Sequence, residues 1–200
     1  MKRILFVCTG NTCRSPMAEA MLHRMALARG MTLAVRSAGI STIDGLPASG
    51  HAVDVLRQRH IEYKGSSRAL TAEAVGWADL ILTMTSDHKR RLLQWYPDAV
   101  DKTSTLKEFA YQSDQVQEDI NELERLYTEL QMQQALGQQL NDEQRTRLLE
   151  LERRIPNFDI VDPFGGSLSM YESCSNEIEE ALAQLLDKLQ NMRNNKRKSD

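Results

Sequence analysis

A short segment near the start of the chain, residues 4–16, constrains the fold more than any other part of the sequence. It reads ILFVCTGNTCRSP, in which an apolar run typical of a buried strand, Ile4–Val7, ends at Cys8. Five residues separate Cys8 from Arg14, and the Ser-Pro pair after Arg14 suits the start of a helix. The segment therefore predicts a strand, a tight loop and a helix, the unit from which α/β sheets are built.

The loop between this strand and this helix suits the binding of an oxyanion. The amides of such a loop, with a helix N-terminus behind them, direct partial positive charge at one place. That field would lower the pKa of Cys8 and hold it as the thiolate, the nucleophilic form. Arg14 carries a planar fork that binds two phosphoryl oxygens. The pair predicts phosphate hydrolysis through a cysteinyl-phosphate; the alternative is a buried cysteine and a surface arginine beside an ordinary turn.

Strand-like and helix-like patterns alternate along the rest of the chain. Apolar runs at Leu33–Val35 and Leu80–Met84 predict two further inner strands. Helical periodicity occurs at residues 17–29, 48–59, 86–95 and about 169–192. This alternation predicts an α/β three-layer sandwich, in which helices cover both faces of a central parallel sheet of about four strands. Ligands of such folds bind at the carboxyl ends of the strands, where Cys8, Ser37 and Thr85 are expected.

Composition favours a single cytoplasmic domain. Two hundred residues with 41% hydrophobic content suffice for one core, and a net charge of −3 argues against a nucleic-acid binder. No apolar run is long enough for a membrane span, and Met1–Val7 lacks the length and cleavage site of a signal peptide. Three cysteines do not form a disulfide framework, which favours a reducing compartment. The histidines lack metal-ligand spacing, so we expect no metal site and no cofactor.

The run VCTGNTCRSPMAE, residues 7–19, resembles the phosphate-binding loop of the low-molecular-weight protein tyrosine phosphatase family. The resemblance is closest to the bacterial protein-arginine-phosphatase branch of that family. Other stretches that agree are Ser37–Gly39, Ala78–Thr85, Thr105–Glu108 and Asp162–Ser167, and the agreement covers about residues 1–112 and 156–192. The resemblance implies a metal-independent phosphatase whose partners are phosphorylated proteins, with inorganic phosphate as product and competing ligand.

The resemblance also implies roles for individual residues. Cys8 would be the nucleophile, Arg14 would bind phosphate and stabilise the transition state, and Asp162 would act as general acid and then as general base. Taken alone, Asp162 before a proline fits a turn equally well. The remaining phosphate-loop and substrate-binding positions would be Thr9, Gly10, Asn11, Thr12, Cys13, Ser15 and Phe164.

For three of these loop residues, more specific roles are expected. Asn11 would hold the shape of the loop through hydrogen bonds from its side chain to the backbone, and Ser15 would donate its hydroxyl to the Cys8 thiolate. Cys13 would be a redox partner, which forms a reversible disulfide with Cys8 and so guards it from irreversible oxidation. The alternative for Cys13 is a small, buried packing residue.

Two departures from the tyrosine-directed pattern bear on the substrate. Tyrosine-directed relatives usually carry a larger aliphatic residue at the position of Thr12, whereas the arginine-phosphatase branch has threonine there. They also tend to carry paired tyrosines after the catalytic aspartate, where this chain has Phe164-Gly165-Gly166, a more open wall. Both departures favour phosphoarginine, with phosphotyrosine as the alternative. Threonine is also a common turn residue, so Thr12 has a second interpretation.

Two other functions share this kind of loop. An arsenate reductase needs a relay of further cysteines, and outside the loop the chain offers only Cys174. A non-catalytic module that binds phosphorylated residues needs neither a nucleophile nor a proton donor, whereas this chain has Cys8 and Asp162. Both are therefore weaker hypotheses than a phosphatase.

Residues 113–155 have no counterpart in the family's usual pattern. Apolar residues recur at intervals of three and four from Val116 to Leu130 and from Leu148 to Ile155, and Asn141 suits the start of the second helix. We therefore expect one phosphatase domain, residues 1–200, with a helical hairpin inserted at about 113–155. The hairpin could be a solvated projection, a surface for self-association or protein docking, or a lid over the Asp162 loop.

Overall fold

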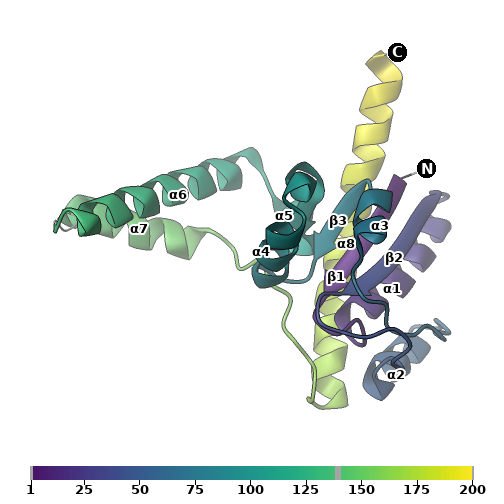
Figure 1. The fold of residues 1–200 in the computed structure, drawn as a ribbon. Coiled ribbons are helices and arrows are strands. Elements are labelled where there is room, and N and C mark those ends of the chain that lie inside the picture. The colour runs from purple at the N-terminus through teal and green to yellow at the C-terminus, as the bar shows by residue number, and fades with distance from the viewer. Residues whose placement is uncertain (1, 138–140, 200) are drawn as a thin grey trace. The chain divides into compact units, whose positions relative to one another are not determined.

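The centre of the fold is a parallel sheet in which β2 (Leu33–Gly39), β1 (Lys2–Cys8), β3 (Leu80–Thr83) and β4 (Thr103–Thr105) follow one another in that order (Figure 1). This computed structural model describes residues 2–137 and 141–199. The sheet confirms the prediction of an α/β fold with about four parallel strands.

Side chains on β1 alternate between two hydrophobic cores, one on each face of the sheet. Ile4 and Phe6 enter one core, and Leu5 and Val7 enter the other. The first core is completed by α1 (Arg14–Ala28), α2 (Gly50–Gln58), α5 (Leu106–Tyr111) and α8 (Leu168–Ser199). The second is completed by α3 (Ala72–Trp77), α4 (Ser86–Trp95) and the 3₁₀ helix η1 (Pro97–Lys102). A strand buried on both faces has a continuous apolar sequence, which is why residues 4–7 gave so clear a signal.

The prediction that Leu33–Val35 forms an inner strand is wrong, because β2 lies at the edge of the sheet. Its first three residues are only half-buried, and Arg36 is exposed. The apolar run was too short to distinguish an edge strand from an inner one. Strand β4 was not predicted, since three residues with the sequence Thr-Ser-Thr carry no apolar pattern.

The order in which strands are added to the sheet reverses direction at β1. The chain moves from β1 to the neighbouring β2 and then returns to place β3 on the other side of β1. Crevices form at such a switch point, outside the carboxyl ends of the strands. Strands β1 and β3 therefore end beside the expected ligand site, β1 at Cys8 and β3 at Thr83.

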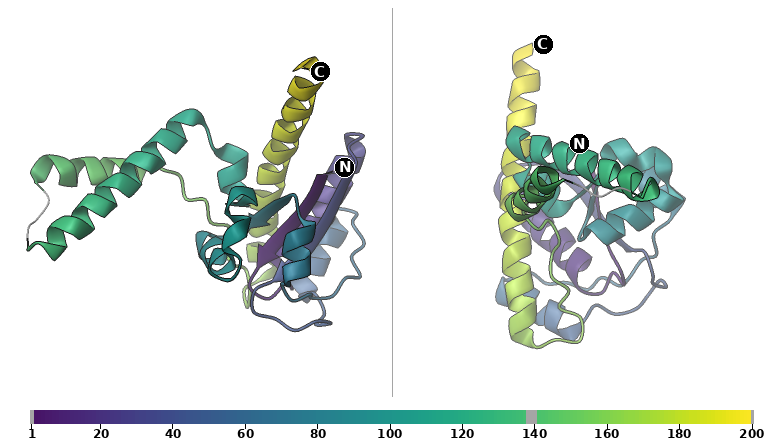
Figure 2. Two further views of the ribbon diagram at one scale, coloured as in Figure 1. Left: turned by 45° about the horizontal axis from the view of Figure 1, so that its top comes forward. Right: turned by 90° about the vertical axis from the view of Figure 1, so that its left-hand side faces the viewer.

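Helix α8 packs along the sheet and extends past it at its C-terminal end (Figure 2). With 32 residues it is the longest helix among the described residues. In the described part of the chain, none of the helices combines the length and the apolar content needed to cross a membrane.

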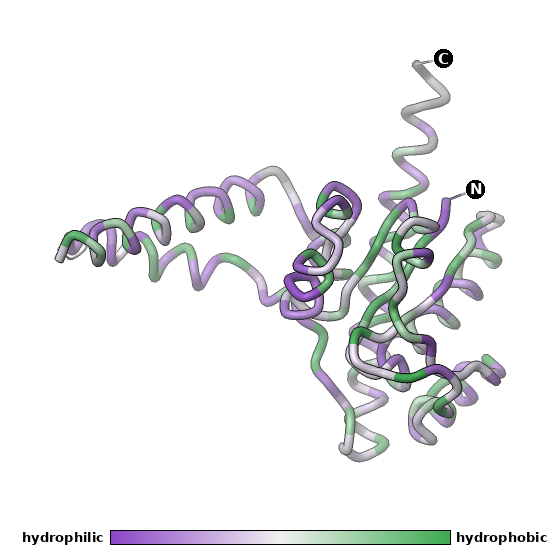
Figure 3. The backbone as a smooth tube through the Cα atoms, viewed as in Figure 1, coloured by the Kyte–Doolittle hydropathy of each residue, from purple (hydrophilic) through white to green (hydrophobic). Residues whose placement is uncertain are grey.

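The chain divides into two compact units, residues 1–111 with 158–200, and residues 112–157. The predicted insertion, about 113–155, falls inside the second unit; whether all 200 residues act as one domain stays a prediction. This second unit contains α6 (Asp114–Ala135) and α7 (Asp142–Arg154), along which hydrophilic and hydrophobic residues alternate (Figure 3).

Ion pairs between α6 and α7 show that the two helices are antiparallel. Asp119 pairs with Arg154, and Glu122 pairs with Arg147, so the partner's number falls as the helix α6 residue's number rises. Leu126 and Leu151 are buried in the second unit, as the helical stripes predicted. The predicted helical hairpin is therefore confirmed as a structure.

The second helix of the hairpin begins where the sequence indicated. The Asn141 side chain accepts a hydrogen bond from the Gln144 backbone N–H, and the Gln144 side chain accepts one from the Asn141 backbone N–H. This reciprocal pair is a capping box, which satisfies two amides that a helix start leaves without partners.

Candidate active site

The loop after β1 wraps around the sulfur of Cys8. Residues 9–13 connect the strand to α1, and the backbone N–H of Asn11 donates to Cys8 Sγ at 3.3 Å. Asn11 has a positive φ of 51°, a left-handed conformation that asparagine tolerates better than most residues. The loop also needs Gly39 beside it, because a Cβ there would lie 2.7 Å from the Thr9 carbonyl oxygen.

Cys8 Sγ lies 3.0 Å from the hydroxyl oxygen of Ser15, a distance at which this hydroxyl can donate a hydrogen bond to the Cys8 thiolate, as expected. The prediction of a lowered Cys8 pKa is wrong, since burial raises the pKa of this thiol. The hydrogen bonds from Ser15 and Asn11 and the charge of Arg14 lower the pKa, but burial outweighs them. The sequence revealed the groups that favour a thiolate and gave no measure of how deeply the sulfur would be buried.

The Asn11 side chain makes three hydrogen bonds, two of them to residues outside the loop. Its Nδ2 donates to Ser15 Oγ and to Ser37 Oγ, both at 2.8 Å, and its Oδ1 accepts from the Arg68 backbone N–H at 2.8 Å. Its side chain thereby connects the phosphate loop to β2 and to the segment after α2. This confirms that Ser37 lies near the expected site. Of the three hydrogen bonds, only the one from Arg68 is of the expected kind, between the Asn11 side chain and the backbone; the other two go to serine hydroxyls.

Arg14 is the first residue of α1, and its guanidinium reaches the loop that carries Asp162. Its Nη2 lies 2.5 Å from Asp162 Oδ2, and its Nη1 donates to the Ile160 carbonyl at 3.1 Å. The Arg14 side chain is 5% exposed and that of Asp162 is 50% exposed. The Asp162 loop is attached to the sheet side as well, because the Ile160 N–H donates to the Met84 carbonyl at 2.8 Å.

A pocket of about 260 Å³ lies over the loop. Its lining residues are Cys8, Thr9, Gly10, Thr12, Cys13, Arg14, Ser41, Asp162 and Phe164. Eight of the ten predicted site residues therefore line one pocket, and the other two, Asn11 and Ser15, are buried and contact Cys8 from behind that lining. Ser41 was missed, because a serine after a strand carries no signal of its own. In residues 2–137 and 141–199, no group of three or more His, Cys, Asp or Glu side chains is arranged to hold a metal ion.

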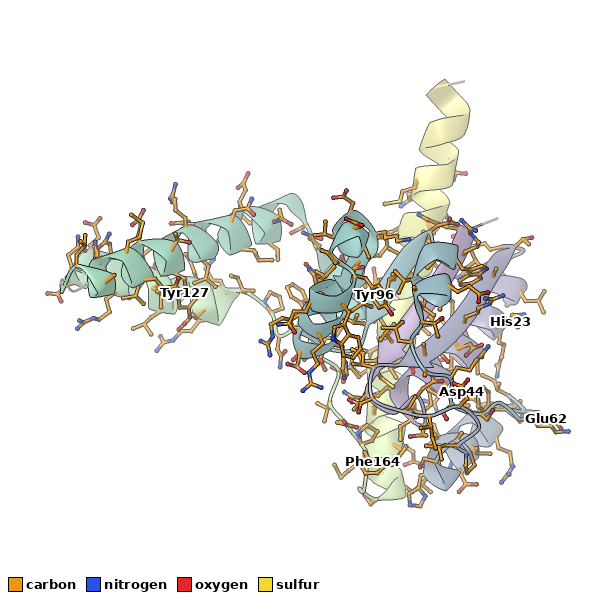
Figure 4. The ribbon with its side chains drawn as sticks, viewed as in Figure 1. His23, Asp44, Glu62, Tyr96, Tyr127 and Phe164 are labelled. Carbon is orange, nitrogen blue, oxygen red and sulfur yellow. The ribbon has the colours of Figure 1, made fainter. Side chains whose placement is uncertain are left out.

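Phe164 forms an open edge of the pocket. It is 75% exposed and lies in the loop before α8 (Figure 4). Its backbone N–H donates to Asp162 Oδ1 at 3.1 Å, which helps to fix the carboxylate. Gly165 follows with a φ of 75°, a left-handed turn that suits glycine.

Cys13 is buried and lies beside an aromatic hydroxyl. Its Sγ lies 3.2 Å from the Tyr171 hydroxyl oxygen, to which Ser49 Oγ donates at 2.9 Å. Cys8 and Cys13 are both free thiols in this structure, so the reversible disulfide between them stays a prediction. Thr12 is part of the lining, and its carbonyl accepts from the Ser49 N–H at 2.8 Å.

His88 was not expected at the site, because the sequence showed only a histidine without metal-ligand spacing. Its Nε2 lies 2.8 Å from Thr9 Oγ1 and its Nδ1 lies 2.9 Å from Thr85 Oγ1. Burial, followed by the charge of Arg14, lowers the pKa of His88 to about 4, so the ring is neutral at physiological pH. Thr85 also caps α4, so His88 connects the phosphate loop to the start of that helix.

Known proteins are similar to this chain in sequence and in fold over nearly its whole length. A protein-arginine-phosphatase of Geobacillus stearothermophilus is 36% identical over 188 residues, which cover 94% of this chain and 96% of that protein. A protein-arginine-phosphatase of Bacillus subtilis is 34% identical over 186 residues, which cover 93% and 95%. A solved structure of an arginine phosphatase mutant with a phosphorylated active-site serine has a TM-score of 0.70 and 34% identity, and covers 94% of this chain and 95% of that chain.

The family model described as low molecular weight phosphotyrosine protein phosphatase matches residues 3–153. The match includes the phosphate loop and ends before Asp162, whose place beside Arg14 comes from the structure. The chain therefore belongs to the low molecular weight phosphotyrosine protein phosphatase family.

Proposed function

We propose that this protein hydrolyses phosphoarginine on proteins through a cysteinyl-phosphate intermediate. The observation that carries the proposal is the convergence of Cys8, Arg14 and Asp162 on one pocket, with Thr12 in its lining. These are a nucleophile, a phosphate clamp and a proton donor, the three groups that such a reaction needs.

In the first step, the Cys8 sulfur attacks phosphorus and the bond from phosphorus to the guanidino nitrogen breaks. Cys8 attacks as the thiolate, the form in which it also leaves in the second step. Burial raises the pKa of Cys8, and the hydrogen bonds from Ser15 and Asn11 and the charge of Arg14 are the influences that favour the thiolate. Arg14 and the loop amides bind the phosphoryl oxygens, and Arg14 follows their charge into the transition state. Asp162, protonated, delivers its proton to the departing nitrogen, which leaves as neutral guanidine.

In the second step, water attacks the phosphorus of the cysteinyl-phosphate. Asp162, now a carboxylate, takes a proton from that water, and the bond between phosphorus and sulfur breaks. The Cys8 thiolate leaves with the Ser15 hydroxyl 3.0 Å away as a donor. Inorganic phosphate is released, and it competes with substrate for the same pocket.

Thr12 and Phe164 support arginine over tyrosine as the phosphorylated residue. Thr12 adds a hydroxyl and little bulk to the pocket lining, where a planar guanidinium has to fit and a water has to be oriented. Phe164, 75% exposed, leaves one side of the pocket open instead of enclosing a phenol ring. Two relatives that match nearly the whole chain are protein-arginine-phosphatases.

Phosphotyrosine is the second candidate substrate. It is favoured by the matching family model, whose description names phosphotyrosine protein phosphatases. The nucleophile, the phosphate-binding arginine and the proton donor would be the same, since both substrates need attack on phosphorus and a proton on the atom that leaves.

The partners of the enzyme would be phosphorylated proteins in the cytoplasm. Its three cysteines are free in the structure, as suits a reducing compartment. Residues 112–157 form a compact unit of their own and are the segment through which self-association or protein docking would occur.

Trapping of the intermediate tests the proposal. An Asp162→Ala variant incubated with a phosphoarginine peptide should carry one phosphate on Cys8, located by mass spectrometry of the acid-quenched, digested protein. A Cys8→Ala variant should carry none. If the wild type binds the peptide but releases neither phosphate nor free arginine peptide, the chain is a binding module and the proposal is wrong.

A further inference from the structure

A closed ring of hydrogen bonds runs through the side chain of Asn11. Asn11 Nδ2 donates to Ser37 Oγ at 2.8 Å, and Ser37 Oγ donates to Glu19 Oε2 at 2.5 Å. Arg68 Nη2 donates to Glu19 Oε1 at 3.0 Å, and the Arg68 backbone N–H donates to Asn11 Oδ1 at 2.8 Å. The ring thus leaves Asn11 through its amide nitrogen and returns to its amide oxygen.

The charged members of the ring lie at its outer end. Asn11 and Ser37 are 2% exposed, whereas the side chains of Glu19 and Arg68 are 17% and 49% exposed. An ionised carboxylate is a stronger acceptor than a neutral oxygen, so Glu19 directs the proton of the Ser37 hydroxyl toward itself. The lone pairs of that hydroxyl are then left for the amide of Asn11.

The second proton of the same amide leads to the nucleophile. Asn11 Nδ2 donates to Ser15 Oγ at 2.8 Å, and Ser15 Oγ lies 3.0 Å from Cys8 Sγ. Because Ser15 Oγ already accepts a hydrogen bond from Asn11, the hydrogen of the Ser15 hydroxyl is directed at the sulfur of Cys8. The orientation of the Ser15 hydroxyl therefore depends on the orientation of the Asn11 amide.

The ring also acts on a strained residue. Asn11 has a φ of 51°, and a residue with a side chain holds such a conformation at a cost that its surroundings must offset. Its backbone N–H, which donates to Cys8 Sγ at 3.3 Å, depends on this conformation.

We propose that Glu19 is a positioning residue for Cys8: with Arg68 it closes the ring that fixes Asn11, and through Asn11 it directs the Ser15 hydroxyl at the nucleophile. The inference rests on the proposed function, in that Cys8 is taken as the nucleophile whose thiolate must form and leave. Glu19 does not touch the substrate pocket and acts only through Ser37 and Asn11.

Other titratable groups near the ring and the nucleophile stay unchanged in the test below. Arg14 and Asp162 line the pocket with Cys8, and His88 lies behind Thr9. Tyr63 lies near the Glu19–Arg68 pair, and burial and the charge of Glu19 raise its pKa to about 12, so it is uncharged near neutral pH.

The test is the pH dependence of Cys8 alkylation by iodoacetamide, followed at the Cys8 peptide by mass spectrometry. In Glu19→Ala the midpoint should rise by about one pH unit, a tenfold loss of thiolate at pH values below it. Glu19→Gln should restore most of the wild-type midpoint, since its amide oxygen still accepts from Ser37. The matched control is Asp187→Asn, which removes a different ion pair, the one with Arg29, the residue that follows the C-terminal end of α1.

The readout separates positioning from general stability. A merely structural Glu19 would lower the melting temperature and leave the alkylation midpoint in place, and that result overturns the proposal. Equal midpoints for Glu19→Ala and Glu19→Gln overturn it too. If Glu19→Ala does not fold, Arg68→Ala takes its place: it keeps the backbone N–H on Asn11, and its midpoint should rise by a smaller amount, whereas no change overturns the proposal.

Because alkylation needs no phosphatase substrate, the two claims can fail separately. Shifted midpoints in the variants, together with a wild type that hydrolyses no phosphorylated peptide, would leave the positioning role standing and overturn the proposed function. Hydrolysis by the wild type with unshifted midpoints in the variants would do the reverse.

Discussion

Arg14 and Asp162 form an ion pair, with Nη2 of the arginine 2.5 Å from Oδ2 of the aspartate. Each is a group that the proposed reaction uses, and each here has the other as its partner. A phosphoryl group that binds over Cys8 would compete with Asp162 for the Arg14 guanidinium.

The first prediction concerns Asp162→Asn. Hydrolysis should slow by about 10²- to 10⁴-fold, the usual contribution of a general acid or base. Inorganic phosphate should bind more tightly, because the variant removes a negative charge that competes for Arg14. Steady-state kinetics and isothermal titration of phosphate measure the two effects, with Asp187→Asn as a control for loss of a distant carboxylate. Slower hydrolysis together with weaker phosphate binding would contradict the competition between carboxylate and phosphate.

Ser15→Ala tests how the thiolate is stabilised. The Ser15 hydroxyl lowers the pKa of Cys8, so its removal should raise that pKa further. A hydrogen bond to a charged group contributes ~1.5–3 kcal/mol, so the rise should be about one to two pH units. The alkylation midpoint of Cys8 measures it, and Ser41→Ala, which alters another hydroxyl-bearing residue of the pocket lining, is the control. An unchanged midpoint in Ser15→Ala would show that the hydroxyl does not hold the thiolate.

His88 makes folding stability depend on pH. Its pKa falls from 6.5 to about 4 in the folded protein, so the unfolded chain binds more protons between these values. The contribution of His88 to the free energy of unfolding should be complete above about pH 6.5 and decrease as the pH falls to about 4.

Urea unfolding across this range provides the check. In His88→Gln the free energy of unfolding should fall less steeply with acid than in the wild type. His23→Gln, which changes an exposed histidine of α1, should keep the wild-type slope. Equal slopes in the wild type and His88→Gln would show that His88 is not buried in its neutral form.

The capping box predicts the local stability of the hairpin. Asn141→Ala removes the acceptor for the Gln144 N–H and should destabilise α7 by ~1 kcal/mol. Hydrogen–deuterium exchange should rise in residues 141–154, whereas exchange in the sheet strands should not change. Asp142→Asn serves as the comparison, because Asp142 lies next to the cap and takes no part in the hydrogen bonds between Asn141 and Gln144. Unchanged exchange in α7 would mean that the cap is not formed in solution.

The parts of the fold that sequence patterns predicted are those with strong burial. Strand β1 was clear because residues 4–7 are buried on both faces, and α7 was clear because Asn141 marks its start. Strand β4 carries three polar residues, and the edge position of β2 depends on contacts that no local pattern encodes.

The predicted site was nearly complete where a motif covered it and incomplete elsewhere. Cys8 and Arg14 lie in one continuous loop, so their spacing in sequence was enough to bring them together. His88 contacts the loop through a hydrogen bond to Thr9, and Glu19 acts on it indirectly, through Ser37 of β2. Such contacts need three-dimensional coordinates. The raised pKa of Cys8 has the same origin, because the burial that causes it belongs to the packed structure.

The most direct test of the proposed function compares kcat/KM for two peptides of the same sequence, one with phosphoarginine and one with phosphotyrosine. The wild type should prefer phosphoarginine by at least about tenfold, a ratio that one well-shaped pocket can supply. Thr12→Ile should move the ratio toward phosphotyrosine. A wild type that prefers phosphotyrosine, with a ratio that Thr12→Ile does not move, would contradict the assignment of phosphoarginine as substrate and of Thr12 as the residue that selects it.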